Sequence, residues 1–185
     1  MNRREALRNI GLLLGAAVTP SVARAVGGGY TAPAPGSPLR ALAASQNELV
    51  ATLTELIIPT TNTPGARAAR VDAFIDGLMA DIFRKEEQER FLAGLADVDA
   101  RAKAAHNVSF VQATPAQQTA LLTAMDQESR GAPRGSRPFF PWLKELTLVG
   151  YYTSEIGATQ ELKYVHVAGK YDGDVPYAQV GRAYS

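Results

Sequence analysis

The chain has 185 residues, with 19 lysines and arginines, 18 aspartates and glutamates, two histidines and no cysteine. A chain of this length can bury a core without disulfide or metal cross-links, so we expect one domain of ordinary size. The lack of cysteine excludes iron–sulfur ligation, thiol catalysis and covalent attachment of a c-type haem, and a net charge of +1 gives no electrostatic case for nucleic-acid binding.

Residues 1–25 are predicted to be an export signal. They combine a positively charged start, a short apolar stretch at Ile10–Val18 and the small-x-small cleavage pattern Ala23-Arg24-Ala25. About nine apolar residues are too few to span a bilayer, which takes ~20. An ordinary secretory signal or an uncleaved anchor is the alternative interpretation.

The arginine pair Arg3-Arg4 indicates which export route the signal uses. Followed by Leu7 and Arg8, the pair resembles the twin-arginine pattern, although Ala6 stands where that pattern usually has phenylalanine. This route carries proteins that are already folded, so it suits a chain that travels with a bound partner. We therefore predict a periplasmic protein whose signal depends on Arg3 and Arg4.

The body of the chain begins after a Gly/Pro-rich linker or arm at residues 26–44. Ser45 and Glu48 have capping-box spacing, which predicts that the first helix begins at Ser45; Pro59 ends it. The segment from Pro59 to Gly65 is dense in turn residues and is predicted to be a loop.

Apolar residues at three- and four-residue steps predict two further helices. The first covers Val71–Phe83. The second helix follows a charged break from Arg84 to Arg90 and ends at His106-Asn107. Their predicted core positions are Val71, Phe74, Ile75, Leu78, Met79 and Ile82 in the first, and Phe91, Leu95, Val98 and Ala102 in the second.

A fourth helix is predicted to begin with Thr114 as N-cap and Pro115 at the first helical position. After a loop at Arg130–Pro138, a fifth begins at about Pro141. The predicted core positions of the fourth helix are Leu121, Leu122 and Met125. Those of the fifth are Trp142, Leu143, Leu146 and Val149. The predicted fold of residues 45–185 is therefore all-α, a small bundle of about five helices. An irregular, Tyr/Gly-rich C-terminal tail follows from about residue 150, with at most a short strand near Leu162–Val167.

Residues that could carry chemistry are scarce. Asp72, Asp76 and Asp81 are scattered around one helix, and the charged run before Phe91 is predicted to be a solvated helix start. His106 suits a helix C-terminus, where a cation is favourable, and no nucleophile is near His166 in sequence. We predict no catalytic, cofactor-binding or metal-binding residue in this chain.

Six of the seven tyrosines lie between Tyr151 and Tyr184. Tyrosine combines a broad apolar ring with a polar tip and is enriched where proteins meet. These rings either seal the tail onto the helices or bind a partner, and both roles are compatible. The residues predicted to bind the partner are Tyr151, Tyr152, Glu155, Tyr164 and Tyr171.

From about Asn47 to Tyr177 the chain resembles the gluconate 2-dehydrogenase subunit 3 family, the small subunits of flavin-dependent sugar and sugar-acid dehydrogenases. The resemblance rests on three segments: Glu55–Thr60 (ELIIPT), the Val71–Phe83 helix, and the block GYYTSEIGATQELKYVHVAGKYDGDVPY, which is the most specific. Members usually begin with a twin-arginine signal.

The resemblance implies a non-catalytic subunit without its own cofactor. It implies a large GMC-type flavoprotein partner that carries FAD, often a multihaem cytochrome c that accepts the electrons, and passage through the twin-arginine translocase. The small subunit would assist maturation and export of the flavoprotein. The alternative function is a free-standing periplasmic saccharide-modifying enzyme, with His166 or an acidic residue as base.

Overall fold

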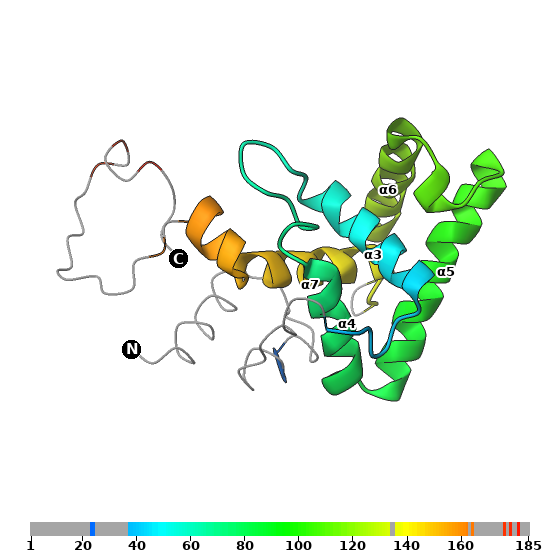
Figure 1. Ribbon diagram of the computed structural model, residues 1–185. Helices are drawn as coiled ribbons and strands as arrows, with labels where there is room; N and C mark the ends of the chain where they lie inside the picture. The colour runs from blue at the N-terminus through cyan, green and yellow to red at the C-terminus, as the bar shows by residue number, and fades with distance from the viewer. Residues whose placement is uncertain are drawn as a thin grey trace.

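The computed structural model describes residues 23–24, 37–133, 136–162, 164, 176, 178 and 181. Within these residues the fold is all-α, as predicted, with five helices of 11 to 22 residues, two short helical turns and no strand (Figure 1). No helix in this part of the chain is long and apolar enough to cross a membrane. The elements are α3 (Ala44–Ile57), α4 (Val71–Asp81), α5 (Lys85–His106), the 3₁₀ turn η1 (Phe110–Gln112), α6 (Pro115–Arg130), α7 (Phe139–Tyr152) and the π-helical turn η2 (Gly157–Glu161).

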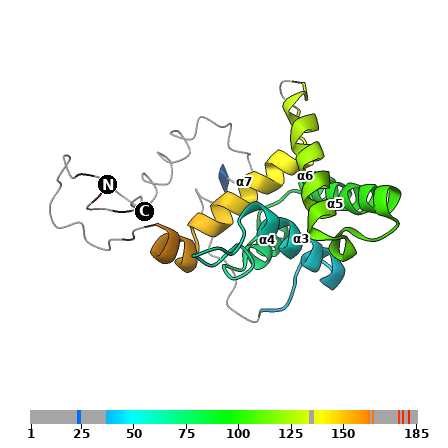
Figure 2. The same cartoon turned by 90° about the horizontal axis from the view of Figure 1, so that it is seen from above.

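The helix α7 is the central element. It contacts α3, α4, α5, α6 and η2. In Figures 1 and 2, α5 and α6 lie towards one end of the fold and η2 lies at the other, with α7 running between them. Its buried side is almost entirely apolar, which is why this helix can lie inside the bundle. The buried residues of α7 are Phe140, Trp142, Leu143, Leu146, Thr147, Gly150 and Tyr151.

The hydrophobic periodicity located α4, α5 and α6 correctly. Every predicted core position of α5 is buried, and on α4 only Ile82, which follows the helix, is half-buried. Thr114 caps α6 as predicted: its Oγ1 accepts from Gln117 N–H at 3.4 Å, and Gln117 Oε1 accepts from Thr114 N–H at 2.9 Å. Asn107 ends α5 in the left-handed conformation, at φ 58°, which asparagine tolerates.

One predicted helix start was wrong, and a second was placed too late, although the charged run before Phe91 was correctly predicted to be a helix start. Ser45 and Glu48 form no capping box, because α3 begins at Ala44 and Gln46 Oε1 accepts the N–H of Ala43 at 2.9 Å instead. The charged residues 85–90 are not a break but the first turns of α5. Acidic side chains are favourable there, since they face the positive end of the helix dipole.

The predicted tail also begins later than expected. α7 starts before Pro141, at Phe139, and continues through Tyr152; η2 then covers Gly157–Glu161. Burial of the α7 side chains outweighs the weak helix propensity of glycine and tyrosine at its end. Of the predicted strand at 162–167, Leu162 and Tyr164 are in neither helix nor strand, and the other residues lie outside the described part.

A buried carboxylate attaches the segment before α3 to α4. Asp76 is 3% exposed, and its two oxygens accept the backbone N–H groups of Arg40, Ala41 and Leu42 at 2.8–3.0 Å. Asp81 forms two 2.6 Å hydrogen bonds with the Arg40 guanidinium, and Asp72 accepts from Asn47 at 3.0 Å. The three aspartates of α4 therefore hold the segment that leads into α3.

We predict that Asp76→Ala destabilises the domain by about 3 kcal/mol or more. Hydrogen bonds to a charged acceptor contribute roughly 1.5–3 kcal/mol each, and the substitution leaves three N–H groups without their acceptor. Asp81→Ala is the control, because it removes only an exposed ion pair and should cost no more than about 1 kcal/mol. Urea unfolding followed by circular dichroism measures both; equal losses for the two variants would contradict the prediction.

Candidate partner-binding surface

Tyr151 is a core residue, and this corrects its place in the predicted partner-binding set. It is 1% exposed, and its hydroxyl donates to the carbonyl oxygen of Pro64 at 2.7 Å. Burial raises the pKa of the Tyr151 phenol, so the hydroxyl stays protonated and remains a donor at neutral pH. Its ring therefore seals the end of α7 onto the domain, the first of the two roles proposed for the tyrosines.

Tyr152, the next residue, points outwards and is 40% exposed. Leu148 lies one helical turn earlier and is 43% exposed, so the two side chains share a face of α7. Glu155 is also exposed, three residues after Tyr152. We call the group Leu148, Tyr152 and Glu155 the Tyr152 surface. An exposed leucine and an exposed tyrosine on one helix face form an apolar patch that also carries a polar hydroxyl. Such patches are typical of the core of a protein interface.

Of the remaining predicted site residues, the structure describes Tyr164 but not the others. Tyr164 is 47% exposed and lies beyond η2. Tyr171, the export arginines Arg3 and Arg4, and His166 lie outside the described residues. The prediction that they carry partner binding, export or base chemistry therefore remains a prediction.

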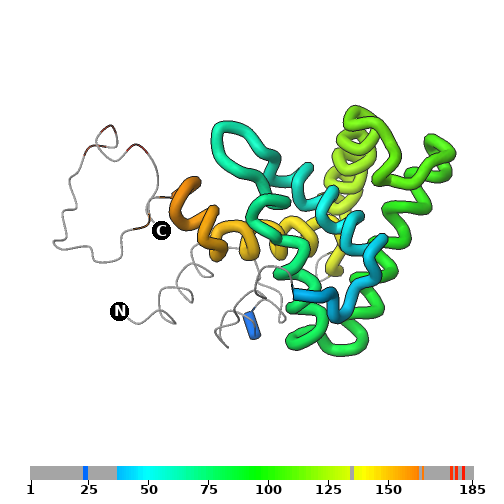
Figure 3. The backbone as a smooth tube through the Cα atoms, viewed as in Figure 1, coloured from blue at the N-terminus to red at the C-terminus, as the bar shows by residue number. Residues whose placement is uncertain are grey.

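A rigid loop lies beside the end of α7. The connection between α3 and α4, at residues 58–70, leaves the helices and returns (Figure 3). The carboxylate of Glu55 accepts from Thr60 N–H and Oγ1 and from Arg67 N–H at 2.7–2.9 Å. Burial alone would raise the pKa of Glu55, but these hydrogen bonds outweigh burial and lower it. The carboxylate is thus charged at neutral pH and holds the loop closed.

Two further hydrogen bonds join this loop to the C-terminal elements. One is the Tyr151–Pro64 bond, and the other runs from Thr63 Oγ1 to Glu161 Oε2 in η2 at 2.6 Å. Gly65 is required here, because a Cβ atom would lie 2.6 Å from the Glu55 carboxylate oxygens. The turn-rich composition predicted a loop but not that its backbone would be fixed.

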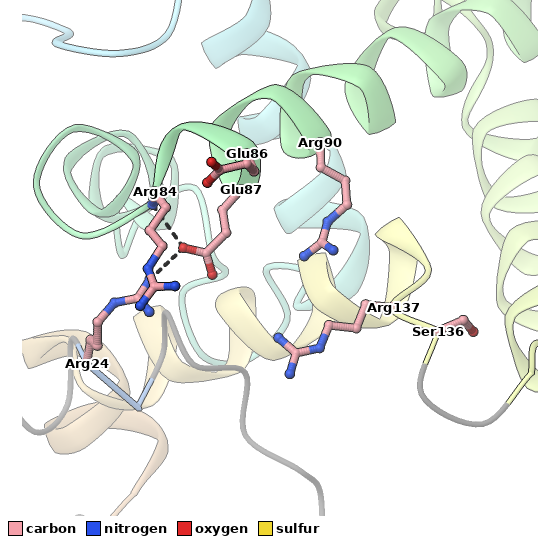
Figure 4. Close-up of a pocket in the computed structure, with 7 residues that line it drawn as sticks. All are labelled: Arg24, Arg84, Glu86, Glu87, Arg90, Ser136 and Arg137. Atoms are coloured by element: carbon pink, nitrogen blue, oxygen red, sulfur yellow. Dashed lines mark hydrogen bonds and ion pairs between the residues drawn. The ribbon is translucent and has the colours of Figure 1, made fainter.

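A second surface feature was missed by the sequence analysis. Four arginines and two glutamates, with Ser136, line an open hollow between the start of α5 and the segment before α7 (Figure 4). We call it the arginine hollow. Its residues come from three separate segments: Arg24, the run Arg84, Glu86, Glu87 and Arg90, and the pair Ser136 and Arg137. No periodicity or motif joins these segments, so no pattern in the sequence indicated the cluster.

Among the described residues of the hollow, Glu87 is the carboxylate that is bonded to the protein. It accepts from Arg84 N–H at 2.9 Å and forms an ion pair with Arg24, whose guanidinium also donates to Ile82 O at 3.2 Å. Burial alone would raise the pKa of Glu87, but the hydrogen bonds from Arg84 and Arg24 outweigh it and lower the pKa. Its negative charge is therefore neutralised inside the protein.

The described residues contain no group of three or more histidines and carboxylates placed to hold a metal ion. The aspartates of α4 instead bind the 40–47 segment, and Glu55 binds its own loop.

The chain was compared with known proteins. A family model described as gluconate 2-dehydrogenase subunit 3 matches residues 44–169, more than half of the chain. No curated protein and no solved structure matches. The matched range runs from the start of α3 to beyond η2, so it includes the Tyr152 surface and all of the arginine hollow except Arg24.

We predict that two neighbouring tyrosines respond differently to truncation. Tyr151→Ala should cost about 3–5 kcal/mol, as for other large buried side chains, and Tyr151→Phe about 1 kcal/mol for the lost hydrogen bond. Tyr152→Ala should cost less than about 1 kcal/mol, because its side chain is largely solvated. Thermal unfolding of the three variants tests this, and a Tyr152→Ala loss as large as that of Tyr151→Ala would contradict it.

Proposed function

Since the chain belongs to the gluconate 2-dehydrogenase subunit 3 family, accessory subunits of a multi-subunit dehydrogenase, we propose that it assists a flavoprotein catalytic subunit without itself catalysing. The partner is a GMC-type dehydrogenase that oxidises a sugar or sugar acid with FAD. A multihaem cytochrome c subunit takes the electrons onward. This chain assists folding and cofactor loading of the flavoprotein and carries it through the twin-arginine route into the periplasm.

The family match across residues 44–169 carries this proposal. The arginine pair Arg3-Arg4 supports the export part, because a twin-arginine signal suits a protein that crosses the membrane folded and with its partner bound. A flavoprotein that has no signal of its own would then depend on this chain. The cofactor chemistry belongs to the partner, and this chain supplies binding.

We assign the flavoprotein contact to the Tyr152 surface and to Tyr164, with Tyr171 further along the chain. Interface energy concentrates in a few aromatic and arginine anchors that lose their water on binding. The fixed backbone of the 58–70 loop and the end of α7 supports this assignment, since an ordered surface loses little conformational entropy on association. Tyr151 is not included, because its ring is buried.

The first test is co-purification. We expect the tagged chain, purified from its natural host, to bring down a yellow subunit with bound flavin, and we expect the chain alone to oxidise no sugar. Tyr152→Ala should weaken capture about thirtyfold, the effect of a 2 kcal/mol anchor. Val111→Ala is the matched control, since Val111 is exposed to a similar degree but lies on η1. Sugar oxidation by the isolated chain would instead favour the free-standing enzyme.

The second test concerns export. Replacing Arg3 and Arg4 together by lysine should leave the flavoprotein in the cytoplasm, because the pair is the feature that the translocase reads. Arg8→Lys makes the same chemical change in the same segment, outside the pair, and should leave export unchanged. Cell fractionation with a flavoprotein activity assay measures both. Normal periplasmic flavoprotein in the double variant would show that this chain does not escort it.

A further inference from the structure

The arginine hollow gathers most of the unpaired arginines of the described chain. Arg24, Arg40, Arg67, Arg101 and Arg130 each form an ion pair with a carboxylate. Of the four described arginines without such a pair, only Arg70 lies elsewhere; Arg84, Arg90 and Arg137 all line the hollow. Figure 4 shows their side chains extending from α5 and from the segment before α7 into the same open space. Like charges repel, so this grouping is unfavourable unless a ligand offsets it.

The protein holds one of these arginines in place. The Arg90 guanidinium carbon lies 5.0 Å from the centre of the Trp142 ring, a cation–π contact. The Trp142 ring is itself fixed, because it stacks on Phe83 at 5.2 Å and meets Phe91 edge-on at 5.4 Å. Arg90 is therefore supported by the aromatic core, although its side chain is exposed to solvent.

The charge of the hollow selects the class of ligand. Its four arginines and two glutamates leave a net charge of +2 while Arg24 is present and pairs with Glu87, and a net charge of +1 if the predicted signal is removed. The start of α5 adds the positive end of a helix dipole. Arginine pairs best with carboxylates and phosphates, which it can bind through two parallel hydrogen bonds.

The shape of the hollow favours an extended ligand over a single small ion. It is open to solvent and has a volume of about 480 Å³, within the range of sites that hold whole molecules. Arg84 immediately precedes α5, Arg90 lies six residues later within the helix, and Arg137 lies on another segment. Several carboxylates spaced along one chain would satisfy this spread of cations better than one anion.

We propose that the arginine hollow binds an acidic segment, rich in aspartate and glutamate, of the flavoprotein partner. The identity of the partner rests on the proposed function, whereas the ligand chemistry rests on the hollow itself. This contact is separate from the Tyr152 surface, which lies at the other end of α7. Arg84, Arg90 and Arg137 bind the carboxylates. All three lie outside the predicted export signal, so removal of residues 1–25 would leave them in place, whereas it would remove Arg24 from beside Glu87.

The binding test uses hexaglutamate peptide and the full chain. Trp142 is the single tryptophan, so a ligand that binds beside Arg90 changes the intrinsic fluorescence. We expect saturable binding that weakens as salt rises, because salt screens exposed charges. The double variant Arg84→Gln with Arg137→Gln should bind about tenfold more weakly, while it keeps the Arg90–Trp142 contact as the reporter. Arg101→Gln is the control, since the Arg101 side chain is 40% exposed and lies on α5 outside the hollow, and it should bind like the wild type.

Three results would overturn the proposal: no saturable response, an unchanged affinity in the double variant, or equal binding of monomeric glutamate or inorganic phosphate at the same anion concentration. Co-purification separates this proposal from the proposed function. If the flavoprotein is captured equally by the double variant, the hollow is not its binding site but the accessory function stands. If hexaglutamate binds and the wild type captures no flavoprotein, the accessory function fails and the acidic-ligand site stands.

Discussion

The close crossing of α7 over α4 positions both candidate surfaces. Gly150 permits it, because a Cβ atom there would lie 2.7 Å from Phe74 Cδ1 and would push the helices apart. With α7 in this position, its first turns hold Trp142 beneath Arg90, and its last turn buries Tyr151 while Tyr152 faces solvent. A helix of 14 residues is roughly 21 Å long. The two surfaces therefore lie at opposite ends of the same helix. One large partner could span the distance between them and contact both.

Four carboxylates of the described chain accept hydrogen bonds from backbone N–H groups. Asp76 accepts three backbone N–H groups, Glu55 accepts two, and Glu87 and Asp99 accept one each. A buried N–H without an acceptor is costly, so these side chains order segments that have no regular secondary structure of their own.

The sequence predicted those features that depend on local pattern. Apolar residues at three- and four-residue steps identified α4 and α5, and the Thr114-Pro115 pair identified the start of α6, because these signals arise within one helix. The inward or outward direction of Tyr151 and Tyr152 could not be predicted, since it depends on how α7 packs against distant residues such as Pro64. The arginine hollow was missed for the same reason.

The loop between α3 and α4 has a consequence for the dynamics of the domain. Exposed loops usually open locally, at a small fraction of the free energy of global unfolding. Here the amides of Thr60 and Arg67 are bonded to Glu55, and the loop is also bonded to Tyr151 and to η2. Opening the loop would therefore disturb the core at the end of α7. We therefore expect the bonded amide hydrogens of Thr60 and Arg67 to exchange with solvent more slowly than those of an ordinary exposed loop.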